Sequence, residues 1–140
     1  MTRYPAKFKP TKAGVSVTFP DLPEIVTEGR TWDEARRNAE EALTLAIEAR
    51  LERDDALPRP SSPGGMVYLA PSGKAQSAML FRWHRGDVSK AELGRRLETS
   101  AWRRINELER GVNITLDRAE RAARAVGFRL VLSYEQEAQQ

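Results

Sequence analysis

The chain has 140 residues, of which 40% are hydrophobic and 31% charged, an ordinary composition for one or two globular domains. No apolar run approaches the ~18 residues that a membrane-spanning helix needs, and residues 1–7 lack the apolar stretch of a signal peptide. The lack of cysteine and the single histidine, His84, exclude thiol nucleophiles, disulfides and metal centres built from Cys or several His side chains. We therefore expect a cytoplasmic protein with no catalytic residue, no metal and no cofactor.

The net charge of +3 is distributed unevenly along the chain. Residues 1–72 carry 10 Lys and Arg against 11 Asp and Glu, whereas residues 73–140 carry 13 against 9. Arg supplies most of the later basic charge, and its planar guanidinium suits phosphates and base edges. A Pro- and Gly-rich stretch at 57–65 and a second break at 71–73 interrupt the chain between these parts. We predict two domains with different partners, 1–72 and 73–140.

The first part of the chain predicts the element order β-β-β-α-β. Apolar and polar residues alternate over 4–9 and 15–19, the period of half-buried strands, and a short strand is expected at 25–28. Thr31-Trp32-Asp33-Glu34 has the pattern of a capping box, and the helix after it carries an apolar stripe as far as Leu51. A last strand, 66–70, is expected to join the same sheet.

The second part predicts short helices and a final strand. The helices are expected over 74–85, from the capping box at Ser89, from Ser100 to about Arg110, and from Thr115 to Val126. Phe128, Leu130 and Leu132 then alternate with Arg129, Val131 and Ser133, as in a strand. Because an unpaired apolar strand invites association, we predict that these three side chains pair with a second copy, giving a homodimer or tetramer.

The segment 93–111 has the pattern of a helix-turn-helix, with Gly94 where two short helices approach each other. On the second helix Ile105 and Leu108 share one face, opposite polar side chains of the kind that read base edges in the major groove. A helical hairpin with a solvated arginine face is the alternative. The candidate DNA-contacting residues are Arg95, Ser100, Trp102, Arg103, Arg104, Asn106 and Arg110.

The same segment resembles the Xre/Cro-type helix-turn-helix of phage-repressor-like regulators. The resemblance rests on residues 92–97, 108–111 and 119–127. The interval between Leu97 and Ile105 is one residue longer than the usual pattern, so Arg104 is an alternative to Arg103 as the groove contact. The resemblance implies operator binding, and a dimer implies an inverted repeat with half-sites about one helical turn apart.

The first part resembles the HicB antitoxin family. Phe19–Pro23, Thr27–Gly29, Trp32–Ala35 and Ala39–Leu43 carry the resemblance, which covers about residues 4–70. It implies a partial RNase H-like domain that binds and neutralises a HicA-type mRNA interferase, with the second domain repressing the protein's own operon and holding it at the nucleoid. Because such a toxin must be basic to hold RNA, we expect three acids near one end of the sheet to face it: Asp21, Glu24 and Glu28.

Two other functions are weighed against this interpretation. A nuclease would need several carboxylates converging on a metal pair, but strands 4–9 and 15–19 contain no acid, and Asp21 and Glu34 fit a turn and a helix cap. A stand-alone helix-turn-helix regulator whose first domain senses a small ligand is the remaining alternative.

Overall fold

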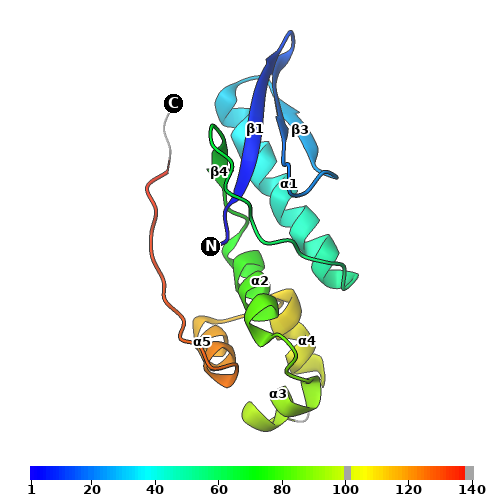
Figure 1. Cartoon of the computed structure of the whole chain (residues 1–140), viewed down its shortest axis with the longest axis vertical. Coiled ribbons are helices and arrows are strands. Elements are labelled where there is room, and N and C mark those ends of the chain that lie inside the picture. The colour runs from blue at the N-terminus through cyan, green and yellow to red at the C-terminus, as the bar shows by residue number, and fades with distance from the viewer. Residues whose placement is uncertain (100–101, 138–140) are drawn as a thin grey trace. The chain divides into compact units, whose positions relative to one another are not determined.

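The computed structural model describes residues 1–99 and 102–137. Contacts divide the chain into two compact units, Met1–Gln76 and a second that begins at Ser77. The described residues form an α+β structure with one four-stranded antiparallel sheet and five helices, and the first four strands and first helix follow the order β-β-β-α-β (Figure 1). Within these residues no helix is both long and apolar enough to cross a membrane.

The sheet of the first unit has the strand order β3-β2-β1-β4. It consists of β1 (Tyr4–Thr11), β2 (Gly14–Thr18), β3 (Val26–Gly29) and β4 (Val67–Leu69). β1 pairs with β2 through a tight turn and with β4 through a much longer connection. At that turn Gly14 has a φ of +152° and packs so closely on β3 that a Cβ atom would lie 2.1 Å from the carbonyl oxygen of Gly29. Glycine is therefore required where β1 turns into β2.

Helix α1 (Trp32–Glu52) begins at the capping box that the sequence predicts. The N–H of Glu34 donates to the hydroxyl of Thr31 over 3.2 Å, and the Glu34 carboxylate accepts the N–H of Arg30 at 3.1 Å. The carboxylate thus reaches one residue further back than in the usual box. The first bond satisfies a backbone donor that the first helical turn leaves unpaired, and the second ties the residue before the cap to the helix.

The core of the first unit lies between α1 and the sheet. The buried side of α1 is the predicted apolar stripe: Ala35, Ala39, Leu43, Ile47 and Leu51. Phe8 of β1 and its cross-strand partner Val17 share a face of the sheet, and Phe8 stacks on Trp32 of α1 with ring centroids 4.3 Å apart. Each fully buried Leu or Ile side chain contributes about 1.5–3 kcal/mol, so this stripe holds the helix on the sheet.

The second unit contains the later part of α2 (Gly73–Arg85), then α3 (Lys90–Arg96), α4 (Trp102–Arg110) and α5 (Leu116–Ala125). One buried side chain from each helix meets in a single cluster: Phe81, Leu93, Ile105 and Ala122. Val88, Leu108 and Val126 pack against the same cluster. This small core fixes which faces of α3 and α4 remain exposed.

The connection that leaves α3 explains the glycine at position 94. A Cβ atom on Gly94 would lie 2.7 Å from the carbonyl oxygen of Thr99, and the N–H of Thr99 donates to the Gly94 carbonyl over 2.8 Å. Glu98 turns the chain with a φ of +54°. Gly94 is therefore required chiefly by the backbone of the turn, while Ile105 lies at an ordinary contact distance from it.

The predicted final strand is absent from the single chain, while the pairing of Phe128, Leu130 and Leu132 with a second copy stays a prediction. Helix α5 ends at Ala125, the N–H of Phe128 donates to the carbonyl of Ala123 just beyond that end, and residues 128–137 then run on without secondary structure. Alternation of apolar residues alone does not make a strand, because a strand exists only where a second strand accepts its hydrogen bonds. Within the described residues the sheet consists of β1 to β4 alone.

Candidate nucleic-acid and partner interfaces

The outer surface of α4 carries the polar side chains that the sequence assigns to DNA. Ile105 is 3% exposed and holds the helix on the core, while Arg103, Asn106 and Arg110 are exposed. Trp102 is also exposed, at 59%. The helix therefore presents an arginine- and asparagine-rich surface on a fixed apolar base, the arrangement that reading a DNA groove requires.

Helix α3 places a lysine beside this surface that sequence reasoning missed. The hydroxyl of Ser89 accepts the N–H of Glu92, so α3 begins where the capping box predicts, and Lys90 is its first residue. The Lys90 Nζ donates to Oδ1 of Asn106 over 3.1 Å and lies 5.6 Å above the Trp102 ring. The capping pattern signals the helix start, but only the packing of α3 on α4 brings Lys90 to Asn106.

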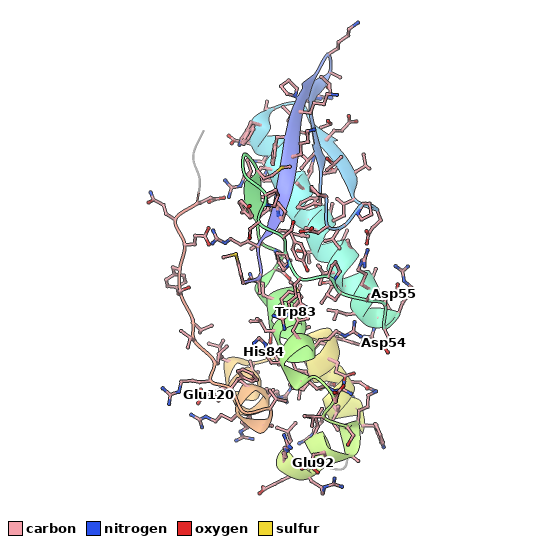
Figure 2. All side chains as sticks on the ribbon, viewed as in Figure 1. Asp54, Asp55, Trp83, His84, Glu92 and Glu120 are labelled. Atoms are coloured by element: carbon pink, nitrogen blue, oxygen red, sulfur yellow. The ribbon has the colours of Figure 1, made fainter. Side chains whose placement is uncertain are left out.

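Two of the candidate arginines have acidic partners within the unit. Glu92 accepts hydrogen bonds from Arg95 and, over 3.1 Å, from Arg96; these bonds lower the pKa of its carboxyl, and Figure 2 shows where Glu92 lies. Arg103 lies 3.3 Å from Glu107 of the next turn. These are exposed pairs of small energy, so Arg95 and Arg103 remain able to turn toward a phosphate or a base.

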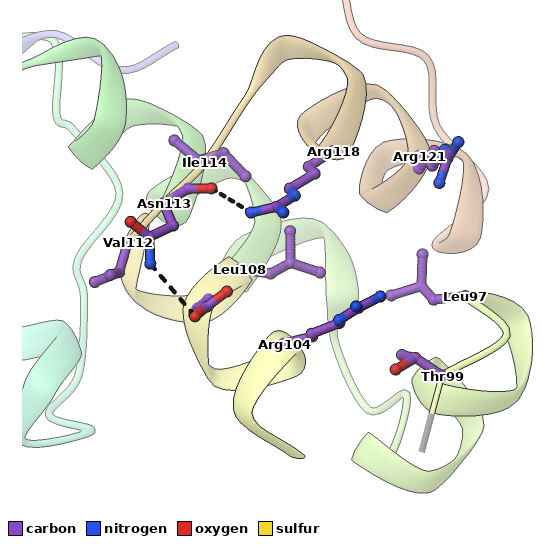
Figure 3. Close-up of a pocket in the computed structure, with 10 residues that line it drawn as sticks. Leu97, Thr99, Arg104, Leu108, Val112, Asn113, Ile114, Arg118 and Arg121 are labelled. Carbon is purple, nitrogen blue, oxygen red and sulfur yellow. Dashed lines mark hydrogen bonds between the residues drawn. The ribbon is translucent and has the colours of Figure 1, made fainter. Parts of the chain in front are cut away.

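Arg104 lies on the other flank of α4. It lines a pocket with Leu108 of α4 and with Arg118 and Arg121 of α5 (Figure 3). Neither Lys90 nor Asn106 lines this pocket. The two alternatives for the helix phase are thus separated in space, since Arg103 lies outside this pocket and Arg104 lines it. Ser100, the remaining candidate, lies outside the described residues.

The three acids predicted to face the toxin differ in their hydrogen-bond partners within the first unit. The Asp21 carboxylate accepts the N–H of Ser61 at 2.9 Å and its hydroxyl at 2.8 Å, which ties the Pro-rich segment to the turn after β2. Glu24 forms a two-pronged pair with Arg50 of α1, at 2.6 and 2.9 Å, and the hydrogen bond from Arg50 lowers the pKa of Glu24. Asp21 and Glu24 therefore stabilise the fold of the first unit, whatever else they contact.

Glu28 on β3 is different, because its carboxylate is exposed and has no hydrogen bond or ion pair among the described residues. Its main-chain carbonyl accepts the side-chain amide of Asn38 over 2.8 Å, which holds the strand against α1. Among the three acids, Glu28 alone presents a carboxylate without a described partner. The structure brings Asp21 and Glu24 into the packing of α1 and the Pro-rich segment instead.

A tyrosine hydroxyl also holds the Pro-rich segment. The Tyr4 hydroxyl donates to the carbonyl of Pro58 over 2.6 Å, and burial raises the pKa of the Tyr4 phenol well above its ordinary value.

Within residues 1–99 and 102–137, no group of three His, Asp or Glu side chains gathers closely enough to hold a metal ion.

Comparisons with known proteins identify the first unit directly. Residues 4–70 match the family described as the HicB-like antitoxin of bacterial toxin-antitoxin systems. The chain is similar to "Antitoxin HicB 2" of Photorhabdus laumondii, with 34% identity over 93% of this chain and 94% of that protein. The chain belongs to the HicB-like antitoxin family.

Two further relatives that align with this antitoxin are also named HicB antitoxins. "Antitoxin HicB 1" of Photorhabdus laumondii is 32% identical over 95% of this chain and 87% of its own length. "Antitoxin HicB" of Escherichia coli K12 is 29% identical over 93% of this chain and 97% of its own length. These alignments span both units of the antitoxin, whereas the family match covers only the sheet, α1 and the Pro-rich segment. Asp21, Glu24 and Glu28 all lie within the matched residues.

Proposed function

We propose that this antitoxin binds and neutralises a HicA-type mRNA interferase through its first unit and represses its own operon through its second. The observation that carries the DNA half is the exposed surface formed by Lys90, Trp102, Arg103 and Asn106 above the buried Ile105. The toxin half is supported by membership of the antitoxin family, whose match covers the first unit. The mechanism is binding and steric covering, without a chemical step.

In this proposal α3 and α4 act as a helix-turn-helix. The N-terminal part of α4 enters the major groove, where Asn106 suits an adenine edge and Arg103 a guanine edge. Lys90 at the start of α3 contacts a phosphate beside the groove, together with Arg95. Each bidentate base contact contributes about 1–3 kcal/mol of discrimination, and each phosphate contact contributes affinity that depends on salt rather than on sequence.

DNA binding is tested by titrating the purified chain onto DNA from upstream of its own gene. Asn106→Ala is expected to weaken binding by about 1–3 kcal/mol and to relax preference at one base position. Lys90→Ala is expected to weaken binding to all DNA sequences alike and to reduce the steepness of the salt dependence of that binding. Arg37→Ala, an exposed arginine of α1, is the matched control.

The phase of the recognition helix follows from the same titration with Arg103→Ala and Arg104→Ala. Arg104 lines the pocket with α5, so we expect Arg103→Ala to lose base preference and Arg104→Ala to keep it. If Arg104→Ala alone loses base preference, Arg104 rather than Arg103 contacts the base. If Arg103→Ala, Arg104→Ala and Asn106→Ala all bind like the parent chain, α4 is not the reader.

Toxin binding is proposed to involve the edge of the sheet at β3, with Glu28 as the acid that meets a basic toxin. Asp21 and Glu24 are proposed to support this surface by fixing the turn before β3 and the end of α1. Because Glu28 is exposed and has no partner among the described residues, reversing its charge is expected to leave the fold intact and to place like charges against the toxin.

The matching experiment measures toxin affinity by calorimetry and growth rescue by co-expression. Glu28→Lys is expected to weaken the complex about tenfold or more, whereas Glu48→Lys, at another exposed acid on α1, is expected to leave it unchanged. Equal affinity of both variants and the parent chain would remove the β3 edge from the interface.

We also propose that the antitoxin associates with itself through its C-terminal segment, as an operator with two-fold symmetry requires. Val131 is 79% exposed and Leu132 66%, a large apolar surface for two neighbouring residues. Removing residues 128–140 is expected to give a monomer in sedimentation experiments. An oligomer that survives this truncation contradicts the assignment.

A further inference from the structure

A pocket of about 110 Å³ lies in the second unit between the end of α3, α4, the 112–114 connection and α5 (Figure 3). Leu97, Leu108, Val112 and Ile114 form its apolar lining. Apolar cavities of about 150 Å³ take up a benzene ring, so this one has room for one branched or part of one aromatic side chain. Val112 at its rim is 45% exposed.

The polar part of the pocket is basic on balance, because three arginines, Arg104, Arg118 and Arg121, line it with one acid, Glu107. Arg118 donates to the carbonyl of Asn113 over 2.6 Å, and the Glu107 carboxylate is taken up by Arg103 at 3.3 Å. Arg104 and Arg121 also line the pocket, and neither has an acidic partner among the described residues. The pocket therefore combines an apolar floor with two guanidinium groups available to an acid.

The segment after α5 has the complementary chemistry. Val131 and Leu132 are 79% and 66% exposed, and Tyr134 is fully exposed. Two acids follow, Glu135 and Glu137, and residues 130–137 contain no basic side chain. Apolar side chains followed by acids are what a pocket with an apolar floor and an arginine rim binds.

The start of this segment is fixed on another part of the unit. The N–H of Phe128 donates to the carbonyl of Ala123 over 2.8 Å, and the Phe128 ring packs edge-on against His84 with centroids 4.4 Å apart. His84 belongs to α2, and no residue of α2 lines the pocket. From Phe128 the chain extends at most about 3.3–3.6 Å per residue, which is long enough for residues 131–137 to reach past the end of their own α5.

We infer that residues 131–137 of one copy dock in the α4–α5 pocket of a second copy, with Leu132 or Tyr134 on the apolar floor and the acids on Arg104 and Arg121. The exchange is reciprocal, so both pockets are filled by one two-fold operation and the assembly closes as a dimer. This inference rests on the proposed self-association and specifies its contact. It replaces pairing of the two segments as strands.

The lack of cysteine in the chain allows a direct test by cross-linking. Full-length Leu132→Cys is mixed with full-length Val112→Cys and oxidised, and the mixed disulfide is expected as the main product. Leu132→Cys mixed with Leu45→Cys is the control, because Leu45 is comparably exposed, at 58%, but lies on α1. Sedimentation of the unoxidised proteins establishes separately that each variant is a dimer.

Four results would overturn the inference. A dimer that gives no mixed disulfide shows that the segment docks elsewhere, and a monomer shows that the self-association itself is absent. A disulfide within single chains of Val112→Cys/Leu132→Cys at low concentration shows that the segment fills its own pocket. Homodisulfides of Leu130→Cys as the main product show that two segments pair with each other as strands.

Charge reversal gives an independent measurement. Arg104→Glu/Arg121→Glu is expected to weaken the dimer at least tenfold, and adding Glu135→Lys/Glu137→Lys to the same chain is expected to restore most of the loss. Arg30→Glu/Arg37→Glu, two exposed arginines of the first unit, makes the same change in net charge and is expected to leave the dimer intact. If the pocket variant loses only DNA affinity and remains a dimer, the pocket binds a phosphate of the operator instead.

Discussion

The close approach of β3 to the start of α1 gives the sharpest test of how the first unit is held together. Gly29 ends β3, and an ideal Cβ atom there would lie 2.2 Å from the backbone nitrogen of Ala35 and 2.6 Å from its Cα. These are main-chain atoms of the first helical turn, so no side chain can rotate away to make room. In Gly29→Ala the helix start must therefore move away from the strand.

The cost of this movement has two parts. Overpacking of a tight contact costs about 1–3 kcal/mol, and shifting the first turn also disturbs the Thr31 cap, which is typically worth about 1 kcal/mol. We expect Gly29→Ala to lower the free energy of unfolding of the first unit by about 2–4 kcal/mol. For a domain of this size each kcal/mol lowers Tm by about 4–8 °C, so Tm is expected to fall by roughly 10–30 °C.

The assay is urea unfolding followed by circular dichroism and by the fluorescence of Trp32, in a chain where Trp83 and Trp102 are replaced by Phe. Trp32 stacks on Phe8 and reports on the first unit alone. Gly64→Ala is the control, because a Cβ atom at Gly64 would meet no heavy atom within 4 Å. A Gly29→Ala chain as stable as Gly64→Ala would refute the reasoning.

Three further predictions concern stability. Because the hydrogen bond from Arg50 lowers the pKa of Glu24, the ion pair stabilises the fold fully above the ordinary pKa of 4.5, and this stabilisation is lost as the pH falls below it. The pair is partly exposed, so Glu24→Gln is expected to cost less than about 1 kcal/mol at pH 7 and nothing at low pH. Acid titration of the two proteins measures this difference. Leu43→Ala, at a fully buried position, is expected to cost about 2–5 kcal/mol in urea unfolding, and an unchanged midpoint would contradict the packing described. Thr115→Ala removes the hydroxyl that accepts the N–H of Arg118 and is expected to cost about 1 kcal/mol, with faster amide exchange confined to the first turn of α5.

Local rules were sufficient for most of the secondary structure. The starts of α1, α3 and α5 follow from Thr31, Ser89 and Thr115, because a cap bonds to an amide three residues away and needs nothing else. The buried side of α1 follows from apolar spacing for a similar reason, since the helical period alone decides which residues share a face. The resemblance to HicB antitoxins also lies in short motifs, and the comparisons confirm it.

Only the tertiary structure decided how charged residues are used. Nothing near Glu24 in the chain indicates that Arg50, 26 residues later, takes its carboxylate, or that Lys90 lies beside Asn106. The predicted final strand is absent from the single chain for the same reason, because its alternating pattern is local but a strand needs a hydrogen-bonding strand from elsewhere. The sequence by itself determined the helix starts, the apolar faces and the family, since these depend on neighbours along the chain. Folding determined which charges are paired and which surfaces remain open, since those depend on residues that only folding brings together.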